Sequence, residues 1–282
     1  MLQIATSIPD IKQKIKFFKE NQLTIGFVPT MGALHEGHLS LVKQAKNEND
    51  VAVVSIFVNP LQFGKNEDFR QYPRTLAHDC ELLSQEGVDI LFNPVDREMY
   101  PDGFYTSVVL NHLEDKLCGK SRPGHFRGVA VVVLKLFNLI KPDIAYFGQK
   151  DFQQTVIIKR IVSDLNLDIS VKILPTIRSA DGLALSSRNA SLNESERKDA
   201  LCLYQSLIKA QSMVNAGIVN AKEIIQEMEK IIGNCKSAKI DYISIVNPET
   251  LEPVSKIQNG DVTALAVYIG KTRLIDNMIL RL

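Results

Sequence analysis

The sequence predicts an α/β fold, in which helices flank an open parallel sheet and a smaller α+β domain follows. Short apolar runs alternate with amphipathic stretches as far as residue 193, the pattern of successive βαβ units. The run at residues 51–58 is apolar almost throughout, which is typical of a strand buried on both faces of a parallel sheet. The domain boundary is expected near residues 175–179, which gives domains at residues 1–177 and 178–282.

The individual elements follow in chain order. Ser7 before Pro9 and Asp10 is typical of a helix start, and apolar residues then recur at helical spacing from Ile11. A Lys-Pro pair closes the apolar stretch at residues 129–140, which therefore indicates a buried helix. Residues 23–28 are expected to form the first strand of the chain. The later strands are expected at residues 51–58, 88–92, 143–147, 169–174, 242–246 and 262–268. The other expected helices cover residues 36–49, 74–86, 151–165, 194–214 and 221–232.

Composition and charge limit the classes of protein to which the chain can belong. Its 282 residues are 45% hydrophobic and 23% charged, which is ordinary for a soluble globular protein with a sizeable core. A formal net charge of +1 gives no reason to expect nucleic acid or an anionic membrane as a partner. No signal peptide and no apolar run of membrane-spanning length is visible, so we expect a cytoplasmic protein. The four cysteines are Cys80, Cys118, Cys202 and Cys235. They lie far apart in the sequence, which disfavours a zinc ribbon or a dithiol redox site.

The most informative stretch is Pro-Thr-Met-Gly-Ala-Leu-His-Glu-Gly-His at residues 29–38, between an expected strand and an expected helix. This arrangement presents backbone N–H groups and a helix dipole to a phosphate. A helix that begins near Glu36 puts His35 and His38 about one turn apart, facing the same point. Two imidazoles there can donate hydrogen bonds to phosphate oxygens as negative charge builds on them. The alternative is a tight turn whose histidines are solvated or buried in the core.

A second stretch, residues 178–189, carries two serines and an arginine beyond a glycine turn. Arg188 can bind phosphate oxygens with two N–H groups, while Ser186 and Ser187 add short donors. A surface loop with a helix cap has the same composition. Taken alone, the stretch leaves a phosphate clamp and a cap as equal alternatives.

A third stretch, residues 148–154, also lies between an expected strand and an expected helix. Lys150 can hold a phosphate as a point charge, and Asp151 is suited to cap the helix. Gln154 is expected on the same helix face as Lys150, one turn further on. The simpler alternative is a charged helix entrance that faces water.

Four single residues elsewhere can also bind small molecules or a metal. Asn59 and Gln62 directly follow the buried strand and offer neutral amides to hydroxyl or carboxylate groups. Arg122 lies in a basic loop that can receive an anion, and Asp79 is a candidate magnesium contact on a helix. The alternatives are a turn residue for Asn59, a solvated glutamine for Gln62 and a solvated acid for Asp79.

Three common signatures of other enzyme classes are absent. Gly119-Lys120-Ser121 resembles the end of a Walker A loop, but position 114 is glutamate where that loop needs glycine. No G-x-G-x-x-G follows the first expected strand, which disfavours a dinucleotide-dependent dehydrogenase. There is also no G-x-S-x-G nucleophile elbow.

The H-x-G-H pattern after a strand, together with a late serine-containing basic loop, resembles the HIGH-type nucleotidyltransferase superfamily. Within it, six strings resemble the pantoate–β-alanine ligase family: PTMGALHEGH, SIFVNPLQF, YPRT, RPGHFRG, FGQKDFQQ and DGLALSSRN. They occur in the family's order between about Thr24 and Asn189. The chain departs from common family strings at Leu185, where methionine is frequent, at Gln149, where glutamate is frequent, and at His78, where some members have a second acid beside Asp79.

The resemblance implies a Rossmann-like domain that binds ATP and pantoate, a smaller lid domain and a homodimer. It implies that (R)-pantoate is joined to β-alanine while ATP, accompanied by Mg²⁺, becomes AMP and pyrophosphate. The catalytic residues that the resemblance implies are His38, His35 and Lys150. The two histidines are expected to stabilise charge at the reacting phosphate, with His38 the better proton donor, and Lys150 to hold phosphate oxygens. The residues expected at the ATP site are Met31, Gly32, Ala33, Leu34, His35, Glu36, Gly37, His38, Gly148, Gln149, Lys150, Asp151, Ile177, Leu185, Ser186, Ser187 and Arg188. Those expected to bind pantoate or β-alanine are Gln62, Gln154, Asn59 and Arg122, with Asp79 as the metal contact.

Three other functions stay open at this point. A related enzyme can transfer a nucleotidyl group to a phosphorylated acceptor, although such an acceptor favours a basic pocket over the neutral pair Gln62 and Gln154. An aminoacyl-tRNA synthetase also uses H-x-G-H, but the chain is short for one and lacks a net basic charge. A non-catalytic nucleotide-binding protein is disfavoured because both histidines, Lys150 and Arg188 are present.

Overall fold

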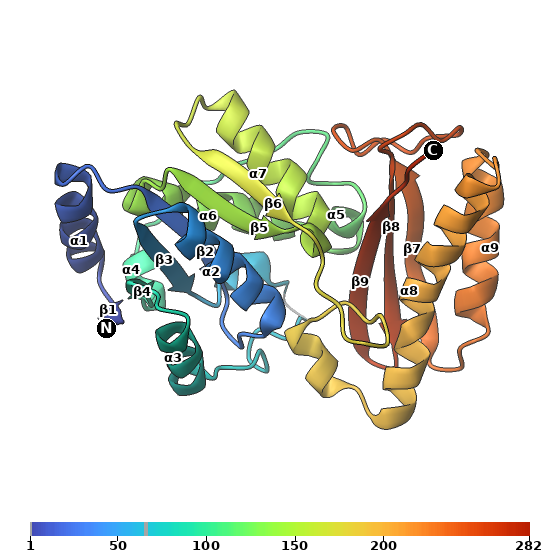
Figure 1. Ribbon diagram of the computed structural model, residues 1–282, viewed down its shortest axis with the longest axis horizontal. Coiled ribbons are helices and arrows are strands. Elements are labelled where there is room, and N and C mark those ends of the chain that lie inside the picture. The colour runs from blue at the N-terminus through green and yellow to red at the C-terminus, as the bar shows by residue number, and fades with distance from the viewer. Residues whose placement is uncertain (1, 65–66) are drawn as a thin grey trace. The chain divides into compact units, whose positions relative to one another are not determined.

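The computed structural model describes residues 2–64 and 67–282, which form two compact units (Figure 1). The first unit comprises Met1–Leu110, Arg122–Gly148 and Ile157–Pro175, and the second comprises Asn111–Ser121, Gln149–Val156 and Thr176–Leu282. The last passage between them, at Pro175, lies two residues before the boundary that the sequence predicts. The sequence predicts two continuous domains and assigns residues 111–121 and 149–156 to the first, whereas the structure groups these two segments with the second unit. The functional assignment of the two domains stays a prediction.

The first unit is built on a six-stranded parallel sheet, which confirms the predicted fold class. Its spatial order is β1-β4-β3-β2-β5-β6. Every residue of β3 is buried, as expected for an apolar run in the middle of a parallel sheet. The strands are β1 (Gln3–Ala5), β2 (Ile25–Thr30), β3 (Val51–Ile56), β4 (Ile90–Phe92), β5 (Ile144–Gly148) and β6 (Ser170–Leu174). The expectation that the run at residues 23–28 forms the first strand is wrong, because β1 precedes it and pairs with β4.

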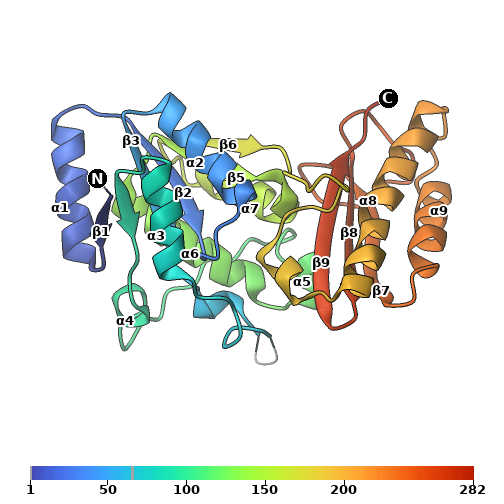
Figure 2. The same ribbon diagram turned by 60° about the horizontal axis from the view of Figure 1, so that its bottom comes forward.

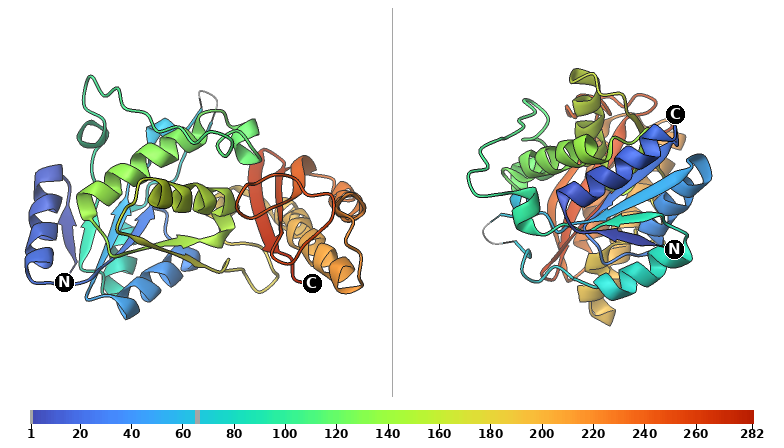
Figure 3. Two further views of the ribbon diagram at one scale, coloured as in Figure 1. Left: turned by 90° about the horizontal axis from the view of Figure 1, so that it is seen from above. Right: turned by 90° about the vertical axis from the view of Figure 1, so that its left-hand side faces the viewer.

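Helices cover both faces of this sheet. α2 and α3 lie on one face, and α6 with α7 lies on the other (Figure 3). This is the arrangement that right-handed crossovers produce when the strand order runs in two directions from a central strand. The helices are α1 (Ile8–Glu20), α2 (Glu36–Glu48), α3 (Leu76–Gln85), α4 (Asp96–Met99), α6 (His125–Ile140) and α7 (Phe152–Asp164), of which α7 belongs to this unit from Ile157 onward.

Local signals in the sequence set the helix starts. Ser7 caps α1 by accepting the Asp10 N–H, as predicted. Asn193 and Glu196 form a complete capping box at the start of α8 (Glu194–Asn215). α6 starts four residues before the predicted position, because the continuous apolar run begins only at Val129 and the first turn, residues 125–128, mixes polar and apolar residues.

The second unit contains an antiparallel sheet with the order β7-β8-β9. Its strands are β7 (Ala238–Val246), β8 (Val262–Ile269) and β9 (Thr272–Ile279), and its longer helices are α8 and α9 (Ala221–Gly233). Figure 2 shows α8 and α9 side by side along this sheet, and an apolar core lies between the helices and the strands. α5 (Cys118–Ser121) and two 3₁₀ turns, η2 (Gln149–Asp151) and η3 (Ser187–Ser191), complete the unit. β9 is not among the strands predicted from the sequence.

Two further features of the chain concern its helices and its cysteines. Among the helices that the structure describes, none combines the length and the apolar composition that a membrane-spanning helix needs. The four cysteines are free thiols, and two of them, Cys118 and Cys202, are buried.

Candidate active site

The order of the strands fixes where a ligand can bind in the first unit. β3, β4 and β1 lie on one side of β2, and β5 and β6 lie on the other, so the order reverses between β2 and β5. In open α/β sheets, ligands bind outside the carboxyl ends of the strands at such a point. β2 ends at Thr30, directly before the stretch with the two histidines, and β5 ends at Gly148, one of the predicted ATP contacts.

A hydroxyl group at the end of β2 holds the turn that follows. The Thr30 Oγ1 accepts the Gly32 N–H at 3.1 Å and donates to the Ser55 carbonyl at 2.8 Å. Gly32 has a φ of +83°, and a Cβ there would lie 3.0 Å from both Asp79 Oδ2 and Ile56 Cγ2. Both the conformation and the available space therefore favour glycine at this position.

Asp79 on α3 holds the next two residues of the turn. Its Oδ2 accepts the Ala33 N–H at 3.0 Å, and its Oδ1 accepts the Leu34 N–H at 2.9 Å. Oδ1 also accepts a hydrogen bond from the Thr75 hydroxyl at 3.2 Å, and Asp79 is only 1% exposed. These contacts give Asp79 a structural role in place of the expected magnesium contact. Among residues 2–64 and 67–282, no group of three or more His, Cys, Asp or Glu side chains is arranged to hold a metal ion.

The two histidines meet at the start of α2, at the spacing that the sequence predicts. The ring centroids of His35 and His38 lie 4.1 Å apart, with 35° between the ring planes. His35 is the N-cap of α2, because its Nδ1 accepts the Gly37 N–H at 3.1 Å. Since Nδ1 accepts, the proton of a neutral His35 ring lies on Nε2, which makes that atom a donor. The dipole of α2 adds positive potential at the same end of the helix, which suits an anion.

One chain of hydrogen bonds joins two of the predicted amides. The Tyr100 hydroxyl donates to Asn59 Oδ1 at 2.8 Å, and Asn59 Nδ2 donates to Gln62 Oε1 and to the Gly128 carbonyl, both at 3.0 Å. Gln62 then directs its Nε2 to the Met31 sulfur at 3.2 Å. Asn59 is 1% exposed and Gln62 is 8% exposed, so a solvated glutamine is excluded. The network fixes the orientation of both amides and places the Gln62 amide donor beside Met31.

Arg122 binds an acidic side chain and a backbone carbonyl of the first unit. Its guanidinium binds both carboxylate oxygens of Glu67, at 2.7 and 2.6 Å, and donates to the Gln62 carbonyl at 3.3 Å. His125 Nδ1 lies 2.7 Å from the same carbonyl oxygen. Burial raises the pKa of Glu67, but the hydrogen bond and charge of Arg122 outweigh it and hold the pKa below its ordinary value. Arg122 thus supports the backbone of Gln62, and its role as a substrate contact stays a prediction.

In the second unit, Lys150 lies on the 3₁₀ turn η2 rather than on a helix. Its Nζ is 3.7 Å from the Asp151 carboxylate, and its side chain is 20% exposed. α7 begins only after this turn, so the expected helical relation between Lys150 and Gln154 does not hold. Of the two neighbouring glutamines at the start of α7, Gln153 is buried and Gln154 is half-buried. Gln153 is 5% exposed, and its amide is hydrogen-bonded to the backbone of residues 113–118 at 2.7–3.0 Å.

The serine-arginine stretch forms a capped turn. The Ser186 hydroxyl accepts the Arg188 N–H at 3.3 Å and caps η3, which confirms a cap at this position. The Leu185 N–H donates to the Ile177 carbonyl at 3.0 Å, so the structure brings two predicted ATP contacts together. A cap formed by Ser186 is compatible with donors on Ser187 and Arg188, whose role in phosphate binding stays a prediction.

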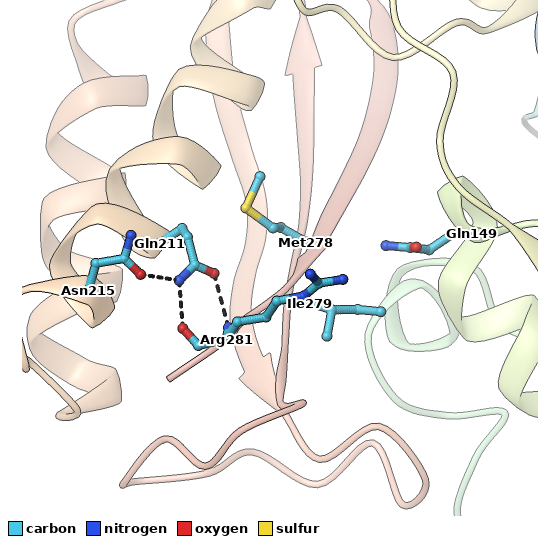
Figure 4. Close-up of a pocket in the computed structure, with 6 residues that line it drawn as sticks. All are labelled: Gln149, Gln211, Asn215, Met278, Ile279 and Arg281. Atoms are coloured by element: carbon cyan, nitrogen blue, oxygen red, sulfur yellow. Dashed lines mark hydrogen bonds between the residues drawn. The ribbon is translucent and has the colours of Figure 1, made fainter.

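A surface cavity of about 460 Å³ also lies in the second unit (Figure 4). Gln211 Nε2 donates to Asn215 Oδ1 at 2.7 Å and to the Arg281 carbonyl at 2.8 Å, and Gln211 Oε1 accepts the Arg281 N–H at 3.0 Å. These groups satisfy one another, and Gln149 is the one lining residue among the predicted contacts. The cavity is therefore not the candidate active site. Its lining residues are Gln149, Gln211, Asn215, Met278, Ile279 and Arg281.

The parallel sheet and the histidine-capped helix at its reversal point define the class: an α/β nucleotide-binding enzyme of the nucleotidyl-transfer type. Comparison with known proteins gives the family. The chain belongs to the pantoate-beta-alanine ligase family, whose model matches residues 3–279. This membership decides among the functions that the sequence analysis left open.

Individual relatives agree over nearly the whole chain. The chain is 52% identical to the pantothenate synthetase of Caldicellulosiruptor saccharolyticus over 276 residues, which is 98% of both chains. A crystal structure of pantothenate synthetase from Thermus thermophilus matches with a TM-score of 0.95 and 43% identity, covering 100% of both chains. The Francisella tularensis ligase, solved in complex with beta-gamma ATP and beta-alanine, matches with a TM-score of 0.83 and 40% identity, over 99% of this chain and 98% of that one.

Proposed function

We propose that this chain is an ATP-dependent ligase that joins (R)-pantoate to β-alanine, with pantothenate, AMP and pyrophosphate as products. The family membership and the ligands of the Francisella tularensis structure support this proposal. The observation that carries it is the histidine pair at the start of α2, which follows the strand at which the sheet order reverses. A helix end of this kind stabilises the charge of a reacting phosphate.

The reaction has two steps. A pantoate carboxylate oxygen attacks the α-phosphorus of ATP, the bond to the bridging oxygen breaks, and pyrophosphate leaves. The amine of β-alanine then attacks the carbonyl carbon of the pantoyl adenylate, and AMP leaves with the oxygen that came from pantoate. The amine nitrogen loses a proton in this step. Because no enzyme nucleophile is needed, catalysis comes from positioning and from stabilising charge.

The residues of the first unit act on the reacting groups. His35 and His38 donate to oxygens of the α-phosphate, and His38 is the proton donor. Met31, Gly32, Ala33 and Leu34 line the nucleotide site, with their backbone held by Thr30 and Asp79. Gln62 binds the hydroxyl or carboxylate groups of pantoate, and Asn59 fixes its amide.

The residues of the second unit bind the nucleotide. Lys150 and the segment of Ser186, Ser187 and Arg188 hold phosphate oxygens, and the backbone at Ile177 contacts the adenine. Gln154 remains a candidate pantoate contact.

Mg²⁺ enters this proposal as part of the MgATP substrate. The described acids do not fit a resident metal, since Asp79 holds backbone N–H groups and no acidic cluster is present among these residues. The charge of the triphosphate is reason enough for a magnesium counterion. A homodimer and a cytoplasmic location are further proposals, which rest on the family resemblance and on the composition.

Isotope exchange tests the adenylate step directly. In the presence of Mg²⁺ and pantoate, and without β-alanine, labelled pyrophosphate is expected to enter ATP. Omitting pantoate is the control and should abolish the exchange. No pantoate-dependent exchange at any magnesium concentration would overturn the proposed mechanism.

A further inference from the structure

Strand β9 carries two adjacent buried polar residues, Asp276 and Asn277, each 3% exposed. They pair with Leu265 and Ala264 of β8, so the backbone of both is in regular sheet register. Neighbouring side chains on a strand point to opposite sides, so the two residues can hold different segments. Buried polar groups need partners, and the partners here lie far away in the sequence.

Asp276 holds the loop that leads to Ser186. Its two carboxylate oxygens accept from the Arg178 guanidinium at 2.6 and 2.8 Å. The same guanidinium donates to the Gly182 carbonyl at 3.1 Å and lies over the Tyr204 ring at 4.1 Å. A bidentate ion pair of this kind fixes both the position and the plane of the arginine. Asp276 thereby anchors the start of the loop that carries the predicted phosphate donors.

Asn277 holds the turn that carries Lys150. Its Nδ2 donates to the backbone carbonyls of Gln149 and Lys150, both at 2.9 Å. Its Oδ1 accepts from the Gln149 side-chain amide at 3.2 Å. Two carbonyls require two N–H donors, which a primary amide supplies and a carboxylate cannot. An asparagine in this orientation thus matches the two carbonyls and the side-chain amide that it contacts.

We infer that Asp276 and Asn277 are positioning residues for nucleotide binding, because one strand holds both segments to which the proposed function assigns the phosphates of ATP. Asn277 sets the backbone of the Lys150 turn. Asp276 acts through Arg178 on the loop before Ser186. Neither residue is assigned a contact with the substrate. The inference rests on the proposed function for the identity of the ligand, and on the hydrogen bonds above for the positioning.

The variant Asn277→Asp tests the inference with a minimal change in shape. It replaces the Nδ2 donor with an oxygen that faces two carbonyls, so the turn around Lys150 must move. We expect the Kd of a non-hydrolysable ATP analogue and the KM for ATP to rise roughly 10- to 100-fold. The KM for β-alanine should stay unchanged. A merely structural role would instead lower the fraction of active protein and reduce kcat with no change in either KM.

The matched control is Asn215→Asp, the same exchange at an exposed residue that lines the cavity beside Gln149. The Asn215 Oδ1 accepts from Gln211 Nε2 at 2.7 Å, and an aspartate oxygen can accept in the same way, so ATP binding should not change. If Asn277→Asp does not fold, as judged by circular dichroism, Asn277→Ser keeps one donor and is compared in the same way. Wild-type affinity for the ATP analogue in the folded variant would overturn the inference. A wild-type protein that neither binds the analogue nor exchanges pyrophosphate would overturn the proposed function instead.

Discussion

In the first unit, the turn after β2 is held through its N–H groups, whereas in the second unit the turn around Lys150 is held through its carbonyls. Asp79 accepts from the backbone of Ala33 and Leu34, and Asn277 donates to the backbone of Gln149 and Lys150. A carboxylate only accepts and an amide nitrogen only donates, so aspartate and asparagine are not interchangeable at either position. Two residues of nearly equal shape thus perform opposite tasks.

The difference also concerns chemistry. The first unit places imidazoles at a helix end, where charge develops in the proposed reaction, while the second unit supplies a lysine and a capped serine-arginine turn for binding. The comparison therefore predicts that changes in the first unit act mainly on kcat and that changes in the second act mainly on the KM for ATP.

The largest effect is expected at His38. The variant His38→Ala should fold normally and lower kcat by about 10²–10³-fold, because it removes one donor that stabilises developing charge. The steady-state rate of pyrophosphate release measures this. His78→Ala, at an exposed histidine on α3, is the control and should retain wild-type activity. A near-normal kcat for His38→Ala would contradict the role in charge stabilisation that is assigned to the first unit.

A smaller effect is expected at Asp79. The variant Asp79→Asn turns an NH₂ group toward a backbone N–H, leaving a buried donor unsatisfied, which costs about 1–3 kcal/mol. The free energy of unfolding, measured by urea titration, should fall by that amount, and kcat should fall with it as the turn loosens. If instead magnesium affinity alone changed, with stability intact, Asp79 would be a metal contact after all.

The smallest effect is expected at Glu67. Its partner Arg122 donates to the Gln62 carbonyl in the first unit, as Arg178 donates to the Gly182 carbonyl in the second. The pKa of Glu67 lies below its unfolded value of about 4.3, so the ionised group stabilises the fold above about pH 5. This contribution is lost as the pH falls through the folded pKa. Between about pH 5 and pH 3, the unfolding free energy of Glu67→Gln should therefore fall less than that of the wild type. Identical pH profiles would show that the ion pair with Arg122 adds no stability.

The turn after β2 was predictable because the residues that define it are neighbours. The apolar run before it, the glycine at Gly32 and the spacing of His35 and His38 all lie within one short stretch, and the structure confirms their arrangement. The buried strand β3 was predictable for the same reason, since continuous apolar residues suffice to indicate it.

What could not be predicted depends on partners that are distant in the sequence. Asp79 reads as a solvated acid or a metal contact until its backbone partners, 45 and 46 residues earlier, are known. β9 escaped detection because Arg273, Asp276 and Asn277 interrupt its apolar pattern. Their partners explain the polar residues: Asp276 binds an arginine 98 positions away, and Asn277 binds a turn 127–128 positions away. No local pattern contains that information.

The most direct test of the central claim uses pantoate labelled with ¹⁸O in its carboxylate. If the carboxylate attacks the α-phosphorus, each turnover should transfer one labelled oxygen to AMP, as measured by mass spectrometry. The pantothenate formed should keep the other labelled oxygen in its amide. Unlabelled AMP, with the label in pyrophosphate or in water, would contradict activation of pantoate as an adenylate.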